Sequence, residues 1–138
     1  MHTEHLQNVS LTRVLTGWLA GVAVTSILLL ALVSAGLVGG GSRVEAFWVL
    51  LVIAVGFWAG GFSIAFRALQ APILHGVAIG ITSLVAWALA NLITSVSGAD
   101  TWSELTPAMT VFLVLEQMVA AVLGTWMGYR MAFAGSEE

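Results

Sequence analysis

The sequence predicts an all-α, polytopic membrane protein with four transmembrane helices in a single domain, residues 1–138. Composition is the first reason: 59% of the residues are hydrophobic and only 8% are charged. A soluble domain carries about 25% charged residues, so this chain could not cover a surface that faces water. The second reason is that the apolar residues fall into four long runs, each exceeding the ~20 residues that cross ~30 Å of hydrocarbon.

The expected spans are about residues 14–38, 46–66, 72–96 and 107–133, and a polar tail, residues 1–12, precedes them. The first run is longer than the ~7–15 apolar residues of a secretory signal core, so we expect it to be a retained span. All four spans would lie in contact with the lipid bilayer.

Turn and capping residues separate the runs. Glycines 39–41 are expected to end the first helix, since glycine adopts the left-handed dihedral angles of a helix terminus. Ser42 and Glu45 have the spacing of a capping box at the start of the second helix. Pro72 and Pro107 suit the first turn of the third and fourth helices, where a missing N–H costs nothing.

The arginines predict the orientation of the chain. With four spans, Arg13, Arg67 and Arg130 lie on one side of the membrane together with both termini, whereas Arg43 lies on the other side. The positive-inside rule then places the N- and C-termini in the cytoplasm. Trp18 would be an aromatic anchor at the cytoplasmic interface.

The two halves of the chain resemble each other. A shift of 63 residues brings Gly61 onto Gly124 and Arg67 onto Arg130, and a shift of 59 aligns the first run with the third. This pattern is typical of two helical hairpins repeated in the same orientation about an axis along the membrane normal. The alternative is that apolar helices resemble one another by composition alone.

Each span also contains two glycines four residues apart, a spacing that lets helix backbones approach closely in lipid. The expected helix-packing residues are Gly17, Gly21, Gly56, Gly60, Gly76, Gly80, Gly124 and Gly128. They would pack either within a four-helix bundle or against another chain.

Glu116 is the acid near the middle of the fourth span. A charged acid at the centre of a membrane helix costs about 2.5–3.5 kcal/mol on insertion scales, so it needs polar partners. The candidate intramembrane polar site consists of Glu116, Gln117, Thr82, Ser83, Thr25, Ser26 and Asn91. The acid could serve as a proton or cation site, or it could stay neutral and fasten helices or meet a partner subunit.

His75 lies near the start of the third span, next to Gly76. A neutral imidazole could ligate haem iron or chlorophyll magnesium, with the small residues around it leaving room for a macrocycle. The alternative is an interfacial histidine that bonds to backbone or lipid. No cofactor is predicted on this basis alone, and no metal site is predicted.

The segment 60–67 reads GGFSIAFR and the segment 74–80 reads LHGVAIG. With these GG-x5-R and HG-x3-G patterns the chain resembles small bacterial four-span membrane proteins of unknown function. The resemblance implies four helices in the bacterial inner membrane and supplies no catalytic residue.

The remaining function classes have little support. The four basic residues are all arginines and are widely spaced, so no basic patch for nucleic acid exists. Phosphate-binding loops, zinc motifs and catalytic triads are also missing from the sequence, which disfavours an enzyme. We expect an accessory or structural subunit of a larger membrane complex, or a homo-oligomeric helix-packing protein. The alternatives are a small proton- or cation-coupled transporter or channel using Glu116, and a cofactor- or pigment-carrying subunit using His75.

Overall fold

A computed structural model of the chain describes residues 8–66, 71–97 and 106–134. Its elements are four α helices, with no strand in the described ranges: α1 Leu11–Ser34, α2 Arg43–Ala65, α3 Pro72–Ser97 and α4 Pro107–Ala134. All four are long and apolar enough to cross a membrane. The predicted fold class, an all-α chain with four membrane-spanning helices, is therefore confirmed.

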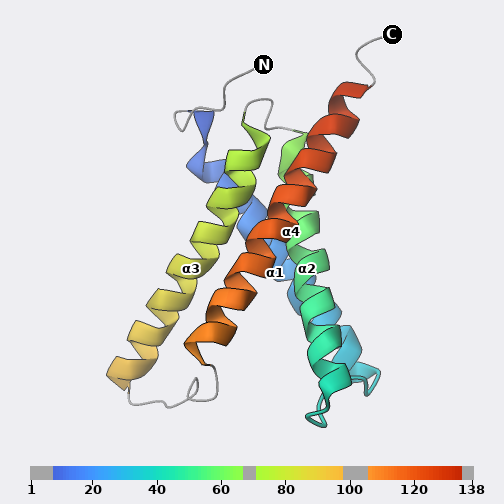
Figure 1. The fold of residues 1–138 in the computed structure, drawn as a ribbon, viewed down its shortest axis with the longest axis vertical. Helices are drawn as coiled ribbons and strands as arrows, with labels where there is room; N and C mark the ends of the chain where they lie inside the picture. The colour runs from blue at the N-terminus through green and yellow to red at the C-terminus, as the bar shows by residue number, and fades with distance from the viewer. Residues whose placement is uncertain (1–7, 67–70, 98–105, 135–138) are drawn as a thin grey trace.

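The helices alternate in direction, so the start of α1 and the end of α4 lie at the same end of the bundle (Figure 1). α2 packs extensively on both α1 and α4, whereas α3 packs mainly on α4 and hardly touches α2. The parallel pair α2 and α4 is therefore the centre of the bundle, and α1 and α3 are attached to its two sides.

The bounds of α1 differ from the predicted span, residues 14–38. The helix begins earlier, because Ser10 is its N-cap and the N–H of Val14 donates to the Ser10 carbonyl at 3.0 Å. It also ends earlier, at Ser34, because Gly36 adopts a φ of +70°. This left-handed residue terminates the helix in the way that glycine commonly does. The last part of the predicted polar tail thus belongs to the first turn of α1.

Glycines 39–41 have a different role from the predicted one. They hold the side chain of Glu45, whose carboxylate accepts hydrogen bonds of 2.9–3.1 Å from all three backbone N–H groups. The hydroxyl of Ser42 accepts from the Glu45 N–H at 3.3 Å, as expected of a capping box. Glu45 itself, however, reaches the preceding glycines and α2 begins at Arg43.

α1 and α2 meet backbone to backbone. A Cβ atom on Gly60 would collide with the carbonyl oxygen of Gly17. A Cβ on Gly56 would collide with the hydroxyl of Thr25 and would lie 2.9 Å from the carbonyl oxygen of Gly21. Only glycine allows this approach, since any side chain would hold the two helices apart.

The contact between α2 and α4 is symmetric. A Cβ on Gly61 would collide with the carbonyl oxygen of Ala121, and a Cβ on Gly124 would collide with that of Trp58. Gly61 and Gly124 are 63 residues apart, and so are Trp58 and Ala121. The shift that relates the two hairpins therefore exchanges the two pairs. A two-fold relation between α2 and α4 is what a parallel repeat of hairpins requires.

α3 approaches α4 in the same manner. A Cβ on Gly76 would lie 2.5 Å from the Cα of Val122, and a Cβ on Gly80 would collide with the side chain of Met118. Each of the eight spaced glycines therefore lies at a contact with another helix of this chain.

The core is concentrated towards the end of the bundle where α1 begins and α4 ends. Its buried apolar residues are Val14, Phe57, Ile64, Ile79, Ala120 and Ala121. Towards the opposite end the lower parts of α2 and α4 diverge (Figure 1), and large apolar side chains such as Leu30 and Val96 are 68% and 82% exposed. Such a surface suits lipid tails, which are as apolar as leucine.

We expect Gly61→Ala and Gly124→Ala to destabilise the bundle by similar amounts. Each introduces a methyl group against a carbonyl oxygen, and overpacking of this kind costs about 1–3 kcal/mol. The free energy of unfolding in detergent micelles measures the effect. Ala88→Val, at an exposed position of α3, is the control and should be neutral. Tolerance of both alanines, or of only one of them, would contradict the symmetric contact.

Candidate functional site

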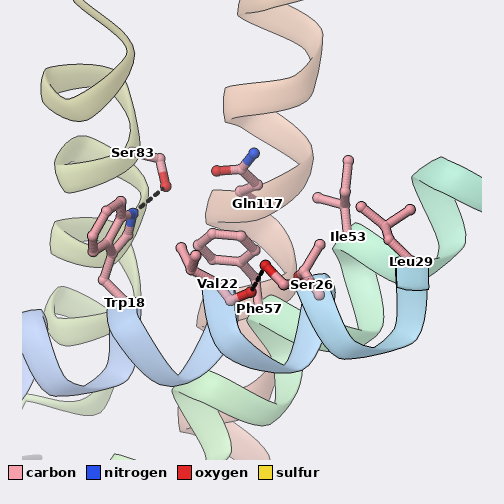
Figure 2. A pocket seen from close by; sticks show the side chains of 9 residues that line it. Trp18, Val22, Ser26, Leu29, Ile53, Phe57, Ser83 and Gln117 are labelled. Carbon is pink, nitrogen blue, oxygen red and sulfur yellow. Dashed lines mark hydrogen bonds between the residues drawn. The ribbon is translucent and has the colours of Figure 1, made fainter. Parts of the chain in front are cut away.

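All four helices contribute to a pocket with a volume of about 280 Å³. Its lining residues are Trp18, Val22, Thr25, Ser26, Leu29, Ile53, Phe57, Ser83 and Gln117 (Figure 2). Five of these come from α1, two from α2 and one each from α3 and α4. None of them is ionisable.

The pocket has a polar and an apolar side. The indole N–H of Trp18 donates to the hydroxyl oxygen of Ser83 at 3.0 Å, and Ser83 is only 7% exposed. Figure 2 shows the amide of Gln117 between this pair and the apolar side chains of Ile53 and Leu29. A ligand here would meet hydrogen-bonding groups at one side and hydrocarbon at the other.

The structure places four of the seven residues of the predicted polar site in this pocket: Thr25, Ser26, Ser83 and Gln117. The Ser26 hydroxyl donates to the carbonyl of Val22 at 2.8 Å. The Thr25 hydroxyl oxygen is buried and has no hydrogen-bond partner among the described residues. It lies against the Cα of Gly56, at the contact of α1 with α2.

Thr82 and Asn91 lie outside the pocket lining and bond within their own helix. The Thr82 hydroxyl donates to the carbonyl of Ala78 at 2.9 Å, and the side-chain N–H of Asn91 donates to that of Trp87 at 2.9 Å. These two side chains therefore provide no link to the acid on α4.

Glu116 is also separate from the pocket, although Gln117 lines it. Successive helix residues point about 100° apart, since a helix has 3.6 residues per turn. Glu116 is partly buried, and its Oε2 atom is buried without a hydrogen-bond partner in the described part of the chain. It lies nine residues after Pro107, roughly 14 Å along α4 at ~1.5 Å per residue. That position is near the middle of a bilayer's hydrocarbon.

His75 lies in the first turn of α3, and its ring bonds to backbone groups, as one of the two alternatives expected. Its ring is fully buried, Nδ1 lies 2.9 Å from the carbonyl oxygen of Ala71, and the Ser10 N–H donates to Nε2 at 3.2 Å. These partners require a neutral ring with its proton on Nδ1. Because both nitrogens have partners, a metal at Nε2 would have to displace the Ser10 amide. The His75 ring, through its hydrogen bond from the Ser10 N–H, joins the start of α1 to the start of α3.

Sequence reasoning missed the apolar wall of the pocket and the position of Trp18. Trp18 was expected as an interfacial anchor, but its indole points into the bundle towards Ser83 (Figure 2). One signal in the sequence could have indicated this position. A buried tryptophan N–H usually needs a hydrogen-bond acceptor, and Ser83 offers a hydroxyl at a similar depth.

Comparison of the chain with protein-family models, with curated proteins and with solved structures finds no match. The resemblance to bacterial four-span proteins therefore stays a prediction, and function has to be inferred from the geometry.

We expect His75→Phe to loosen the start of α1. Phenylalanine fills the space but leaves the Ser10 N–H without its partner, at a cost of about 1–3 kcal/mol for an unsatisfied buried group, whereas the Ala71 carbonyl still accepts from the backbone N–H of residue 75. Unfolding in micelles and amide hydrogen exchange of the first turn of α1 measure the loss. Thr16→Val, which removes only an exposed bond to the Thr12 carbonyl, is the control. Unchanged exchange in His75→Phe would contradict a joining role for His75.

Proposed function

We propose that this chain is a non-enzymatic membrane protein that associates with another transmembrane chain through the face of α4 that carries Glu116. The partner is a subunit of a larger membrane complex, for which this chain is an accessory or structural subunit, or a second copy of the chain. The observation that carries the proposal is the half-buried carboxyl group of Glu116, which makes no hydrogen bond in the described part of the chain and whose Oε2 atom alone is covered by this chain.

A carboxyl group in hydrocarbon needs a hydrogen-bond partner from protein, because no water is available there to bond to it. An unsatisfied polar group in hydrocarbon costs roughly several kcal/mol. The polar residues nearest to Glu116 along α4 do not supply one. Gln117 lines the pocket, the Thr110 hydroxyl donates to the carbonyl of Thr106 at 3.3 Å, and the Thr125 hydroxyl donates to that of Val122 at 3.0 Å. A donor from another chain would meet the carboxyl group at Oε1, because Oε2 is covered by this chain.

The surroundings of Glu116 on α4 fit a helix–helix contact. Phe112, Val119 and Leu123 are 57%, 56% and 49% exposed. They lie four residues before, three after and seven after Glu116, so the helix period places all four on one face. An apolar strip with one acid at its centre suits a partner helix that offers a donor better than it suits lipid. The spaced glycines already face helices of this chain.

The proposed location is the bacterial inner membrane, with both termini in the cytoplasm. The resemblance to bacterial four-span proteins supports the membrane, and the arginines support the orientation. Arg13 near the start of α1 and Arg130 near the end of α4 lie at one end of the bundle, and Arg43 at the start of α2 lies at the other. The Arg130 guanidinium lies 4.9 Å from the Trp126 ring centroid, a pair suited to a membrane interface.

The alternatives have less support. A transporter based on Glu116 would need a polar path through the acid, but Glu116 does not line the pocket and the pocket residues are not ionisable. A cofactor site at His75 would need a free ring nitrogen, and both nitrogens have partners.

The test is purification of the tagged chain from its native membrane in mild detergent, with Glu116→Leu and Glu116→Gln beside the wild type. Mass spectrometry identifies the bound polypeptides and their stoichiometry. We expect a stoichiometric partner or a second copy with the wild type. The amount of bound partner should fall at least ten-fold in Glu116→Leu. It should be partly retained in Glu116→Gln, whose amide can still accept a hydrogen bond.

Gln117→Leu is the matched control, because the adjacent side chain faces the pocket instead of the outer strip. It should retain the partner. Recovery of the wild type as a monomer without a partner, or an unchanged complex in Glu116→Leu, would overturn the proposal.

A further inference from the structure

The pocket among the four helices has the size of a ligand site. Its volume of about 280 Å³ is nearly twice that of the ~150 Å³ engineered apolar cavity that admits benzene. Trp18, Val22 and Phe57 form apolar walls around it. Small-molecule sites typically combine such walls with a few polar groups that orient the ligand.

The polar side of the pocket offers hydrogen-bond donors. The Ser83 oxygen already accepts from the Trp18 N–H, and its own hydroxyl hydrogen has no acceptor among the described residues. The Gln117 amide has no hydrogen bond within the described part of the chain; its oxygen lies on the side of Ser83 and its nitrogen points away (Figure 2). The last torsion of a glutamine side chain is broad, so rotation of this unbonded amide brings its N–H group to the Ser83 side, where the two donors suit an acceptor oxygen.

The depth of these donors requires a neutral ligand. Ser83 lies eleven residues after Pro72 and Gln117 ten after Pro107, which is roughly 15–17 Å along each helix at ~1.5 Å per residue. Both side chains therefore lie near the middle of ~30 Å of hydrocarbon. A charged headgroup is costly at that depth, and the pocket contains no ionisable residue to pair with it.

We propose that the pocket binds a neutral, lipid-soluble carbonyl compound. Its oxygen accepts hydrogen bonds from the Ser83 hydroxyl and the Gln117 amide, and its apolar body lies against Phe57, Ile53 and Leu29. The site does not involve Glu116 and is independent of the association proposed above.

The probe is benzophenone, a neutral ring compound whose carbonyl also cross-links to nearby C–H groups under near-ultraviolet light. Purified protein in lipid nanodiscs is irradiated over a range of probe concentrations, and labelled residues are identified by mass spectrometry. Because the carbonyl group lies at the polar side in the proposed pose, we expect saturable labelling of the pocket residues there, Val22, Ser83 and Gln117. Labelling that rises without saturation and spreads over exposed residues would mean partition into lipid only, and would overturn the proposal.

A pair of competitors tests recognition of the carbonyl. Dicyclohexyl ketone and dicyclohexylmethane have similar shapes, but only the ketone has an acceptor oxygen. The ketone should displace benzophenone about five-fold more effectively, which corresponds to a net hydrogen bond. Equal displacement by both compounds would contradict the assigned ligand class.

Two variants complete the test. Ile53→Trp fills the pocket and should abolish saturable labelling, whereas Leu51→Trp, at an exposed position of the same helix, should not. Gln117→Leu keeps the volume and should remove most of the preference for the ketone. If Ile53→Trp fails to fold, Gln117→Leu decides: a preserved five-fold preference would overturn the proposal.

Discussion

Contact of backbones at the glycines of α2 is the interaction on which the rest of the bundle depends. Gly56 and Gly60 face α1, and Gly61 faces α4, so one helix is held on two sides with no side chain between the backbones. In lipid no hydrophobic force drives helices together, and close packing with Cα–H···O contacts provides the attraction instead. The carbonyl oxygens of Gly17 and Ala121 lie where these contacts form.

The distribution of small and large residues along the helices then produces the pocket. In α1 the glycines lie in the first half, and the bulky segment 27–33 follows; in α2 the bulky segment 47–53 comes first. Because the two helices are antiparallel, both bulky segments lie at the same end of the bundle. The helices approach where glycines meet, and α2 and α4 diverge towards the end that carries the large side chains (Figure 1). The pocket lies at this transition, next to Phe57 and Thr25.

Length and composition were sufficient to predict four membrane helices, because a bilayer requires ~20 apolar residues per span. Prediction of which side chains point inwards was weaker. A helix that is apolar all round has no polar face to indicate its exposed side. For this reason Trp18 was misplaced at an interface and His75 was not expected to be fully buried. The end of α1 was missed because the turn begins at Gly36, before the more conspicuous glycines 39–41.

Disulfide formation in this cysteine-free chain tests the central contact most directly. The shift of 63 residues pairs Ala65 with Gly128. A Cβ on residue 128 would lie 2.6 Å from that of Ala65, so a movement of about 1 Å brings the two to the ~3.5–4.5 Å of a disulfide. The same shift pairs Phe47 with Thr110 at the diverging end. The account predicts rapid oxidation within one chain for Ala65→Cys with Gly128→Cys, and little for Phe47→Cys with Thr110→Cys. Equal rates for both pairs, or disulfides only between chains, would contradict a parallel α2–α4 pair that is closed at one end.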